Sequence, residues 1–260
     1  MDMNIIHATI LGIVEGVTEF LPISSTAHLI IASKLLNLQQ TEFQKFFEVF
    51  IQSGAILAVV ILYFQYILKH KELFKKIGLS FIPTAIIGLF LYKIIKNVFF
   101  ASNTLIIDAI FIVGLLFIIL EYLITKKKIV LKHSLTQMTP FQAVLTGLVQ
   151  SLAVIPGVSR SGIVMFYLMS QGFKRDEAAT YSFILAVPTL FAASGYDLFK
   201  MRHVFSGSLQ YIPLLFVGFM MSFFVAYVVM KWFIGYLQKN SLTNFGIYRL
   251  ALAIILMFVF

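Results

Sequence analysis

Two short polar segments interrupt an otherwise apolar sequence, and both carry side chains that could act on phosphate. The first, GIVEGVTEFLPISSTAH at residues 12–28, contains two glutamates, a run of hydroxyls and a histidine. The second, VIPGVSRSG at 154–162, contains Arg160. An ionisable group at membrane depth costs at least ~2.5 kcal/mol, so such clusters are candidate functional sites. Two carboxylates, one arginine and several hydroxyls together indicate phosphate chemistry.

Glu15 and Glu19 are four residues apart, which on a helix places both carboxylates on one face, one turn from each other. Like charges at this separation resist joint ionisation. The pair therefore requires a shared proton or a divalent cation, and Mg²⁺ and Ca²⁺ prefer carboxylate oxygens. The alternative is a surface helix with two solvated acids, which the apolar neighbours Phe20 and Leu21 disfavour.

Hydroxyl side chains and a histidine follow Pro22: Ser24, Ser25, Thr26 and His28. A serine here can cap the apolar helix that follows, and the histidine then lies in its first turn, facing the loop. A hydroxyl beside an imidazole is the nucleophile and base pairing of covalent catalysis. The alternative is that the serines only cap the helix while the histidine packs at its surface. The neighbouring glutamates favour the catalytic interpretation.

The second segment supplies a different kind of group. Gly157 and Gly162 let backbone N–H groups approach a ligand, and a helix beginning near Ser159 aims its positive end at the loop. Arg160 adds a permanently charged fork that suits phosphate oxygens. These features predict an anion-binding loop, with a structural or snorkelling arginine as the alternative.

Other polar residues lie within or beside the apolar stretches. Glu48 and Gln52, one helical turn apart, either support the two loops from a distance or hydrogen-bond between helices. Arg249 lies inside the last apolar stretch and is expected to pair with a carbonyl or an acid. Four further charged residues are expected to reach the membrane interface: Asp108, Asp197, Lys93 and Lys96.

The elements that position these groups must lie in a membrane. Of the 260 residues, 60% are hydrophobic and 12% are charged, and the mean hydropathy of +0.95 exceeds that of a soluble domain. A hydrocarbon core of about 30 Å requires about 20 helical residues. We therefore expect an all-α polytopic membrane protein with six membrane-spanning stretches, at 46–68, 77–97, 104–124, 178–198, 209–231 and 243–260.

The net charge of +9 follows from this membrane topology, so nucleic acid is not an expected partner. Loops at 69–76, 125–133, 174–175 and 231–239 hold twelve of the twenty Lys and Arg residues, against six in the opposite loops. The positive-inside rule assigns these four loops to the cytoplasm. The chain has no cysteine, which excludes disulfides and thiolate chemistry.

The two polar segments are copies of one pattern. GLVQSLAVIPGVSRSG at 147–162 matches GIVEGVTEFLPISSTA at 12–27, with Gln150 in place of Glu15. After a one-residue gap, the match also pairs two prolines and two serines: Pro156 with Pro22, and Ser159 with Ser25.

Each copy precedes three expected spans, and an odd number of crossings gives the two halves opposite orientation. We expect a single integral membrane domain, 1–260, built as an inverted-topology repeat. Because prolines interrupt each polar segment, each half should be a re-entrant helix-loop-helix plus three transmembrane helices, with the two loops meeting near the midplane. The expected units are repeat one at 1–124, a basic cytoplasmic linker at 125–139 and repeat two at 140–260.

The motifs EGVTEFLPISSTAHL and PGVSRSG resemble the two signatures of the undecaprenyl-diphosphatase family, also called bacitracin resistance proteins. The likeness covers the whole chain, including FEVFIQSGAILAVV, YSFILAVPTLFAA and FGIYR. It implies hydrolysis of undecaprenyl diphosphate to undecaprenyl phosphate and inorganic phosphate, which recycles the lipid carrier of cell-wall synthesis and confers bacitracin resistance. It also implies a bacterial plasma membrane and an active site that opens to the outer face; the chain is a monomer or a homodimer.

The resemblance assigns the site residues motif by motif. The acidic motif falls on Glu15 and Glu19, where Mg²⁺ or Ca²⁺ is expected. The other two motifs fall on Ser24, Ser25, Thr26 and His28 and on Ser159, Arg160 and Ser161, with Gly157 beside them.

Two mechanisms are compatible with these residues. In one, Ser25 attacks the terminal phosphorus while His28 or Glu19 takes its proton; in the other, Glu19 or His28 activates water directly. Arg160 and the two helix N-termini would hold the diphosphate.

Transport is the competing class of function, because secondary transporters also build substrate sites from inverted repeats with broken helices. A lipid-binding protein without catalysis is the third. The hydroxyl and histidine pair favours an enzyme, since a transporter needs no nucleophile.

Overall fold

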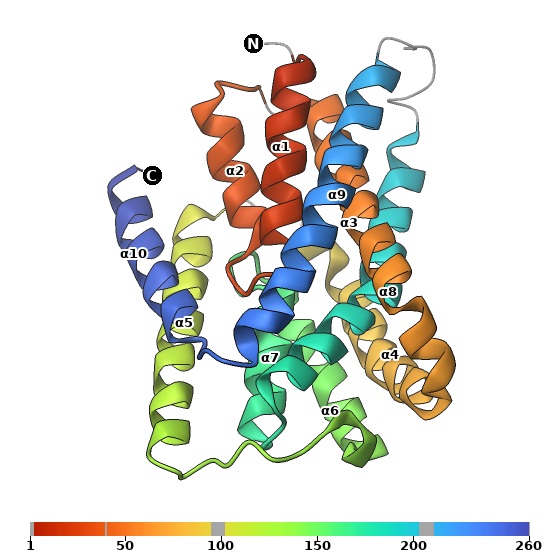
Figure 1. Cartoon of the computed structure of the whole chain (residues 1–260). Helices are drawn as coiled ribbons and strands as arrows, with labels where there is room; N and C mark the ends of the chain where they lie inside the picture. The colour runs from red at the N-terminus through yellow and green to blue at the C-terminus, as the bar shows by residue number, and fades with distance from the viewer. Residues whose placement is uncertain (1–2, 40, 95–101, 203–210, 260) are drawn as a thin grey trace.

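The computed structural model describes residues 3–39, 41–94, 102–202 and 211–259, and these residues are mostly helical (Figure 1). They contain no strand, and one isolated bridge joins His133 to Phe173. The α-helices are α1 (Ile5–Thr18), α2 (Ser25–Leu35), α3 (Glu42–Lys69), α4 (Lys71–Ile94), α5 (Asn103–Thr125), α6 (Pro140–Gln150), α7 (Arg160–Ser170), α8 (Arg175–Lys200), α9 (Ile212–Leu237) and α10 (Thr243–Val259), with short 3₁₀ turns at Leu135–Gln137 and Ser151–Val154.

Five helices of the described part are long and apolar enough to cross a membrane: α3, α4, α5, α8 and α9. They confirm five of the six predicted spans; residues 95–97 and 209–210 of those predictions lie outside the described part. The sixth prediction, 243–260, coincides with α10, which has 17 residues. At 1.5 Å per residue α10 is about 25 Å long, shorter than a hydrocarbon core of about 30 Å. Residue 260 of this prediction lies outside the described part, so five of the six predicted spans are confirmed and the sixth stays a prediction.

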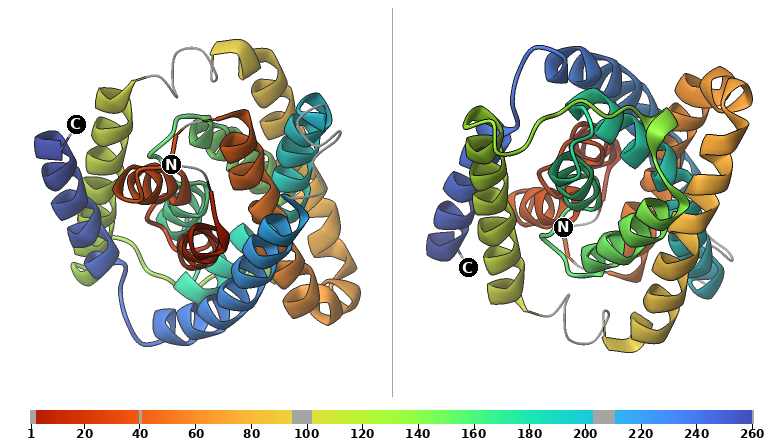
Figure 2. Two further views of the ribbon diagram at one scale, coloured as in Figure 1. Left: turned by 90° about the horizontal axis from the view of Figure 1, so that it is seen from above. Right: turned by 90° about the horizontal axis from the view of Figure 1, so that it is seen from below.

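The short helices α1, α2, α6 and α7 form two helix-loop-helix hairpins, as the interrupting prolines predicted. The hairpin α1–α2 lies in one half of the molecule and α6–α7 in the other, with their loops between them (Figure 1). Helices of 11 to 14 residues are about 17–21 Å long, too short to cross a membrane. Figure 2 shows them in the middle of the molecule, with the long helices around them.

Local sequence explains where the hairpin helices begin and end. Asn4 caps α1 by accepting a hydrogen bond from His7 N, and Thr139 caps α6 with a full capping box. α1 ends shortly before Pro22, and α6 passes into a 3₁₀ turn before Pro156. Each proline lacks the N–H that a continuing helix would need, so the chain turns back.

The basic loops at 69–76, 125–133 and 174–175 lie at one end of the molecule, and the turn from α9 to α10 lies in the same half (Figure 1). Two hydrogen bonds tie these loops together, from Lys76 Nζ to the Leu135 carbonyl and from Lys174 N to the His133 carbonyl. The prediction that the basic loops share one side is confirmed as geometry. The assignment of that side to the cytoplasm stays a prediction.

Candidate active site

α1 delivers its two glutamates to the centre of the molecule. Glu15 lies in the last turn of α1, and Glu19 follows as its C-cap with helical backbone angles and an N–H bonded to the Glu15 carbonyl. Both side chains are buried: Glu15 is 0% exposed and Glu19 is 8% exposed. Neither carboxylate oxygen of Glu15 has a hydrogen-bond partner among the described residues.

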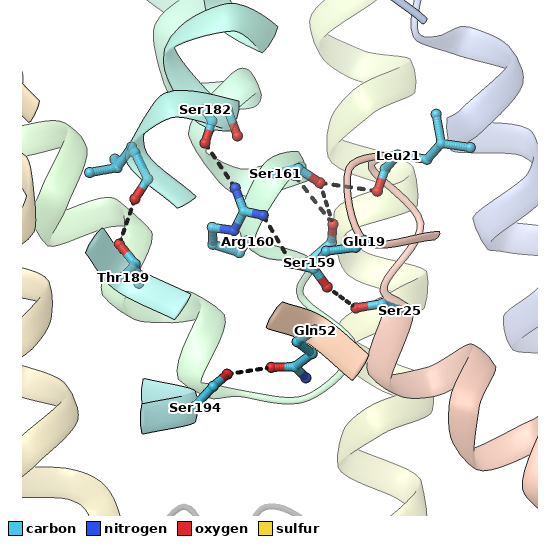
Figure 3. A network of polar contacts seen from close by, with 12 residues as sticks. Glu19, Leu21, Ser25, Gln52, Ser159, Arg160, Ser161, Ser182, Thr189 and Ser194 are labelled. Atoms are coloured by element: carbon cyan, nitrogen blue, oxygen red, sulfur yellow. Dashed lines mark hydrogen bonds and ion pairs between the residues drawn. The ribbon is translucent and has the colours of Figure 1, made fainter. Parts of the chain in front are cut away.

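Glu19 joins the two hairpins. Its Oε1 accepts from Arg160 Nη2 at 2.9 Å, and its Oε2 accepts from Ser25 Oγ at 2.6 Å (Figure 3). Arg160 comes from the start of α7 and Ser25 from the start of α2, 141 and 6 residues from Glu19 along the chain. The carboxylate predicted to bind a metal is therefore also the group that places the candidate nucleophile beside the candidate phosphate clamp.

Arg160 is held rigidly. Its Nη1 donates to the Ser182 carbonyl at 2.8 Å, and its guanidinium lies over the ring of Phe20, 5.6 Å from the ring centre. In the ion pair with Glu19, the two side chains are 9% and 6% exposed. Arg160 Nε has no partner in the described residues. A buried, charged donor with free bonding capacity suits an anionic ligand, and the alternative of a snorkelling arginine is wrong because this side chain does not reach solvent.

A second contact binds the loops to each other. Ser161 Oγ donates to the Leu21 carbonyl at 3.0 Å and lies 3.2 Å from Ser159 Oγ. Ser159 Oγ in turn accepts from Gly162 N, which makes it the N-cap of α7. Ser159 and Ser161 thus lie beside Arg160, as the motif predicted, but their hydroxyls already have protein partners.

The two short helices that carry the site begin in the same unusual way. Ser24 precedes α2 with φ 73° and ψ 93°, and Ser159 precedes α7 with φ 71° and ψ 113°. Few residues other than glycine adopt positive φ, because Cβ then crowds the backbone. By helix start, Ser159 corresponds to Ser24 and Arg160 to Ser25, so the sequence alignment that paired Ser159 with Ser25 is shifted by one residue.

The two ring nitrogens of His28 bond to groups other than the Ser25 hydroxyl. Its Nδ1 lies 2.7 Å from the Ser24 carbonyl, and its Nε2 lies 2.6 Å from the hydroxyl of Tyr248. A carbonyl only accepts, so Nδ1 carries the proton and Nε2 accepts from the tyrosine. The imidazole therefore bonds to the loop backbone, and Glu19 is the carboxylate that accepts from the Ser25 hydroxyl.

Two further residues were predicted to contact the ligand, Thr26 and Gly157. Thr26 is half-buried in the first turn of α2, and none of the hydrogen bonds described above involves it. Gly157 has φ 97°, and a Cβ there would collide with the backbone of α5 at Ile106. Its glycine is therefore required by packing, and its contact with a ligand stays a prediction.

The other polar residues of the spans serve the architecture. Glu48 accepts from Ser33 of α2, and Gln52 accepts from Ser194 of α8, so both connect helices. Arg249 is fully buried and donates to backbone carbonyls, as expected. Among the residues expected at the interface, Asp108 is exposed and Asp197 half-buried, while the side chains of Lys93 and Lys96 lie outside the described part.

Comparison with known proteins identifies the family of this chain. The sequence model of the bacitracin resistance protein BacA matches residues 8–255, nearly the whole chain. The chain belongs to the BacA family.

Curated relatives of this BacA-family chain match it from end to end. A protein of Sulfurihydrogenibium sp. is 47% identical over 253 residues, which cover 97% of this chain and 98% of that protein. One from Persephonella marina is 46% identical over 258 residues, 99% and 100% of the two chains, and one from Aquifex aeolicus is 42% identical over 249 residues, 96% of each. All three relatives are named undecaprenyl-diphosphatase.

The residues present fit a divalent metal. Both oxygens of Glu15 are buried without a partner, a costly arrangement unless a proton or cation is supplied. The described residues contain no group of three or more His, Cys, Asp or Glu side chains that could hold a metal ion. Glu15 and Glu19 would be the protein donors, and Mg²⁺ commonly binds through one or two carboxylates together with substrate phosphates.

Two contacts at the site were not predicted from the sequence. Tyr248 reaches His28 from a helix 220 residues away, and the backbone carbonyl of Ser182 holds Arg160. A backbone carbonyl leaves no signature in side-chain identity. Tyr248 lies in the segment FGIYR, beside a charged residue inside an apolar helix, and that pairing is a signal that could have identified it.

Proposed function

We propose that this chain hydrolyses undecaprenyl diphosphate to undecaprenyl phosphate and inorganic phosphate. The observation that carries the proposal is the bridge that Glu19 makes between the Ser25 hydroxyl and the Arg160 guanidinium. That bridge brings a nucleophile, a base and a phosphate-binding cation together. The names of the relatives supply the substrate.

Ser25 is the proposed nucleophile. Its Oγ attacks the terminal phosphorus, the bond from that phosphorus to the bridging oxygen breaks, and the lipid monophosphate leaves. Glu19 Oε2, 2.6 Å from Ser25 Oγ, takes the serine proton. Water then attacks the phosphoserine, which releases inorganic phosphate and restores the hydroxyl.

Arg160 and the metal site neutralise the negative charge of the substrate. The guanidinium exchanges part of its ion pair with Glu19 for phosphate oxygens, and its bond to the Ser182 carbonyl keeps it in place. A divalent cation held by Glu15 and Glu19 would supply further charge neutralisation to the diphosphate. His28 positions the Ser24 carbonyl and is not required as the base.

Phosphate release by the purified protein in detergent tests this function. With a polyprenyl diphosphate and Mg²⁺ or Ca²⁺, we expect release of inorganic phosphate that stops when the metal is chelated. If the lipid diphosphate is intact and solubilised in the detergent and no phosphate is released, the proposal is overturned. Covalent chemistry is tested separately, by trapping phosphoserine at Ser25 in a slowed variant; hydrolysis without any trapped phosphoserine would favour direct attack by water.

We also propose that the chain lies in the bacterial plasma membrane as an inverted repeat whose site opens to the outer face. The basic loops in one half of the molecule support this orientation, and the two hairpins that enter from opposite halves support the repeat (Figure 1). A cysteine placed in this cysteine-free chain at Leu35, the exposed last residue of α2, should react with a membrane-impermeant thiol reagent from outside intact cells. The homodimer stays a prediction.

Lipid transport is the second candidate, because two broken hairpins that meet from opposite halves also suit alternating access. Proteoliposomes distinguish the two. Movement of polyprenyl phosphate across the bilayer without release of phosphate would favour a transporter over a phosphatase.

A further inference from the structure

The C-terminal helix α10 contributes two consecutive residues, Tyr248 and Arg249, that reach the loops of both hairpins. Arg249 is 0% exposed and donates to five backbone carbonyls. These carbonyls belong to α5, to the first loop and to the second loop: Ala109 at 3.3 Å, Ile110 at 3.2 Å, Pro22 at 3.1 Å, Gly157 at 2.6 Å and Val158 at 3.3 Å.

No carboxylate lies within ion-pair distance of Arg249 in the part of the chain that the structure describes. Burial of a guanidinium without a counter-ion is costly. The carbonyl hydrogen bonds offset that cost here, together with the ring of Phe117, whose centre lies 6.0 Å from the guanidinium carbon. Only arginine presents five N–H donors in a rigid fork, whereas lysine offers three donors from one point. The arrangement is therefore specific for arginine at this position.

α10 is itself fixed against α5. A Cβ added to Gly246 would come within 2.9 Å of the Gly114 carbonyl oxygen, and one added to Gly114 within 2.9 Å of Arg249 Cβ. The two helix backbones thus approach closely through these glycines. Arg249 projects from a rigid base, and the loops are held relative to that base.

Tyr248 acts on the first loop through His28. Its hydroxyl donates to His28 Nε2 at 2.6 Å, and the two rings are stacked with centres 5.7 Å apart. His28 Nδ1 in turn donates to the carbonyl of Ser24, the residue with positive φ that precedes Ser25. Tyr248 is 43% exposed, so loss of its hydroxyl would leave the packing intact.

We propose that α10 positions the active site: Arg249 holds the two loops in register, and Tyr248 holds the imidazole that fixes the Ser24 carbonyl. Both are positioning residues, because they act through the loops that bring Ser25 and Arg160 to Glu19. The kinetic consequence rests on the proposed phosphatase function. The effect on the order of the loops does not rest on that function.

Arg249→Lys and Tyr248→Phe test this inference in the purified full-length protein. In Arg249→Lys we expect faster amide hydrogen exchange at residues 20–26 and 155–161, with exchange in α3 and α9 unchanged. Its kcat for phosphate release should fall about 100-fold with little change in KM, because misplacement of reacting groups by about 1 Å has this effect. Tyr248→Phe should lower kcat about five- to tenfold and raise exchange at residues 20–26 only.

Matched controls separate positioning from general stability. Arg175→Lys changes an arginine that pairs with Glu121, and Tyr122→Phe changes an exposed tyrosine of α5; neither residue contacts the loops, and both variants should keep kcat within twofold. Wild-type kcat and loop exchange in Arg249→Lys would overturn the inference. If that variant does not fold, Tyr248→Phe decides: unchanged kcat and exchange overturn it. A wild-type protein without phosphatase activity whose loops still respond to Arg249→Lys would contradict only the proposed function.

Discussion

The two hairpins have the same backbone geometry where their second helices begin, but they carry different chemical groups. Both place a serine with positive φ directly before a short helix, Ser24 at φ 73° and Ser159 at φ 71°. At the position before the loop, however, α1 carries Glu15 where α6 carries Gln150. The first hairpin therefore holds the carboxylates and the proposed nucleophile, Ser25, and the second holds the cation, Arg160.

The buried polar groups at these matched positions differ in charge more than in pairing. Gln150 Nε2 donates to the hydroxyls of Thr84 and Thr189, at 2.9 and 3.1 Å, so its amide N–H is satisfied within the protein. Gln150 Oε1 and both oxygens of Glu15 lack a partner among the described residues, and so does Arg160 Nε. Buried polar groups are rarely left unpaired without a functional reason. We infer that ligand completes both hairpins, the first through its carboxylates and the second through its cation.

The largest difference in activity between the two hairpins is expected when the serine hydroxyl at the start of each is removed. Ser25→Ala removes the proposed nucleophile, so we expect kcat for phosphate release to fall roughly 10⁴-fold or more. Ser159→Ala, at the start of the corresponding helix, removes an N-cap and should lower stability by about 1 kcal/mol with a much smaller loss of rate. Steady-state assays of both variants provide the measurement. Comparable losses in the two would contradict the assignment of the nucleophile to the first hairpin.

Arg160→Ala should have the next largest effect. It removes the phosphate clamp and leaves Glu19 buried without its ion pair, so kcat/KM should fall roughly 10³-fold. The thermal unfolding midpoint, measured alongside, reports the structural part of the loss. Arg160→Lys, which keeps the charge without the fork, should retain more activity. Near-normal phosphate release by Arg160→Ala would contradict the assignment of Arg160 as the phosphate-binding residue.

Glu15→Gln gives the first hairpin the amide of the second. If Glu15 binds the metal, the variant should need a higher Mg²⁺ concentration for half-maximal activity and lose about 10²-fold in rate. Its stability should not fall, because an unpaired buried carboxylate is removed. Titration of Mg²⁺ into chelator-treated protein measures the shift. Gln150→Glu is the control: it should destabilise the fold and leave the metal requirement as in the wild type.

Local sequence signals predicted the two hairpins, and they predicted that Glu19, Ser25 and Arg160 would lie in one place. Prolines, glycines and apolar runs act over a few residues, so they identify broken helices and spans from the sequence alone. Contacts between distant segments carry no such signal. Arg249 meets the Pro22 carbonyl across 227 residues, and nothing in either residue's neighbours specifies that contact.

One error in the sequence analysis has a related origin. The one-residue shift between Ser159 and Ser24 arose because sequence matching places a gap by identity, whereas the N-cap is fixed by backbone geometry.

The smallest expected effect concerns the shared backbone itself. Glycine relieves the strain of positive φ, worth about 1 kcal/mol, so Ser24→Gly should raise the thermal unfolding midpoint by about 2–4 °C. Ser24 makes no side-chain capping hydrogen bond, whereas Ser159 accepts from Gly162 N and lies within bonding distance of Ser161. Ser159→Gly loses those bonds as it relieves the strain, so its rise should be smaller. An equal or larger rise at Ser159 would show that its hydroxyl adds nothing to stability.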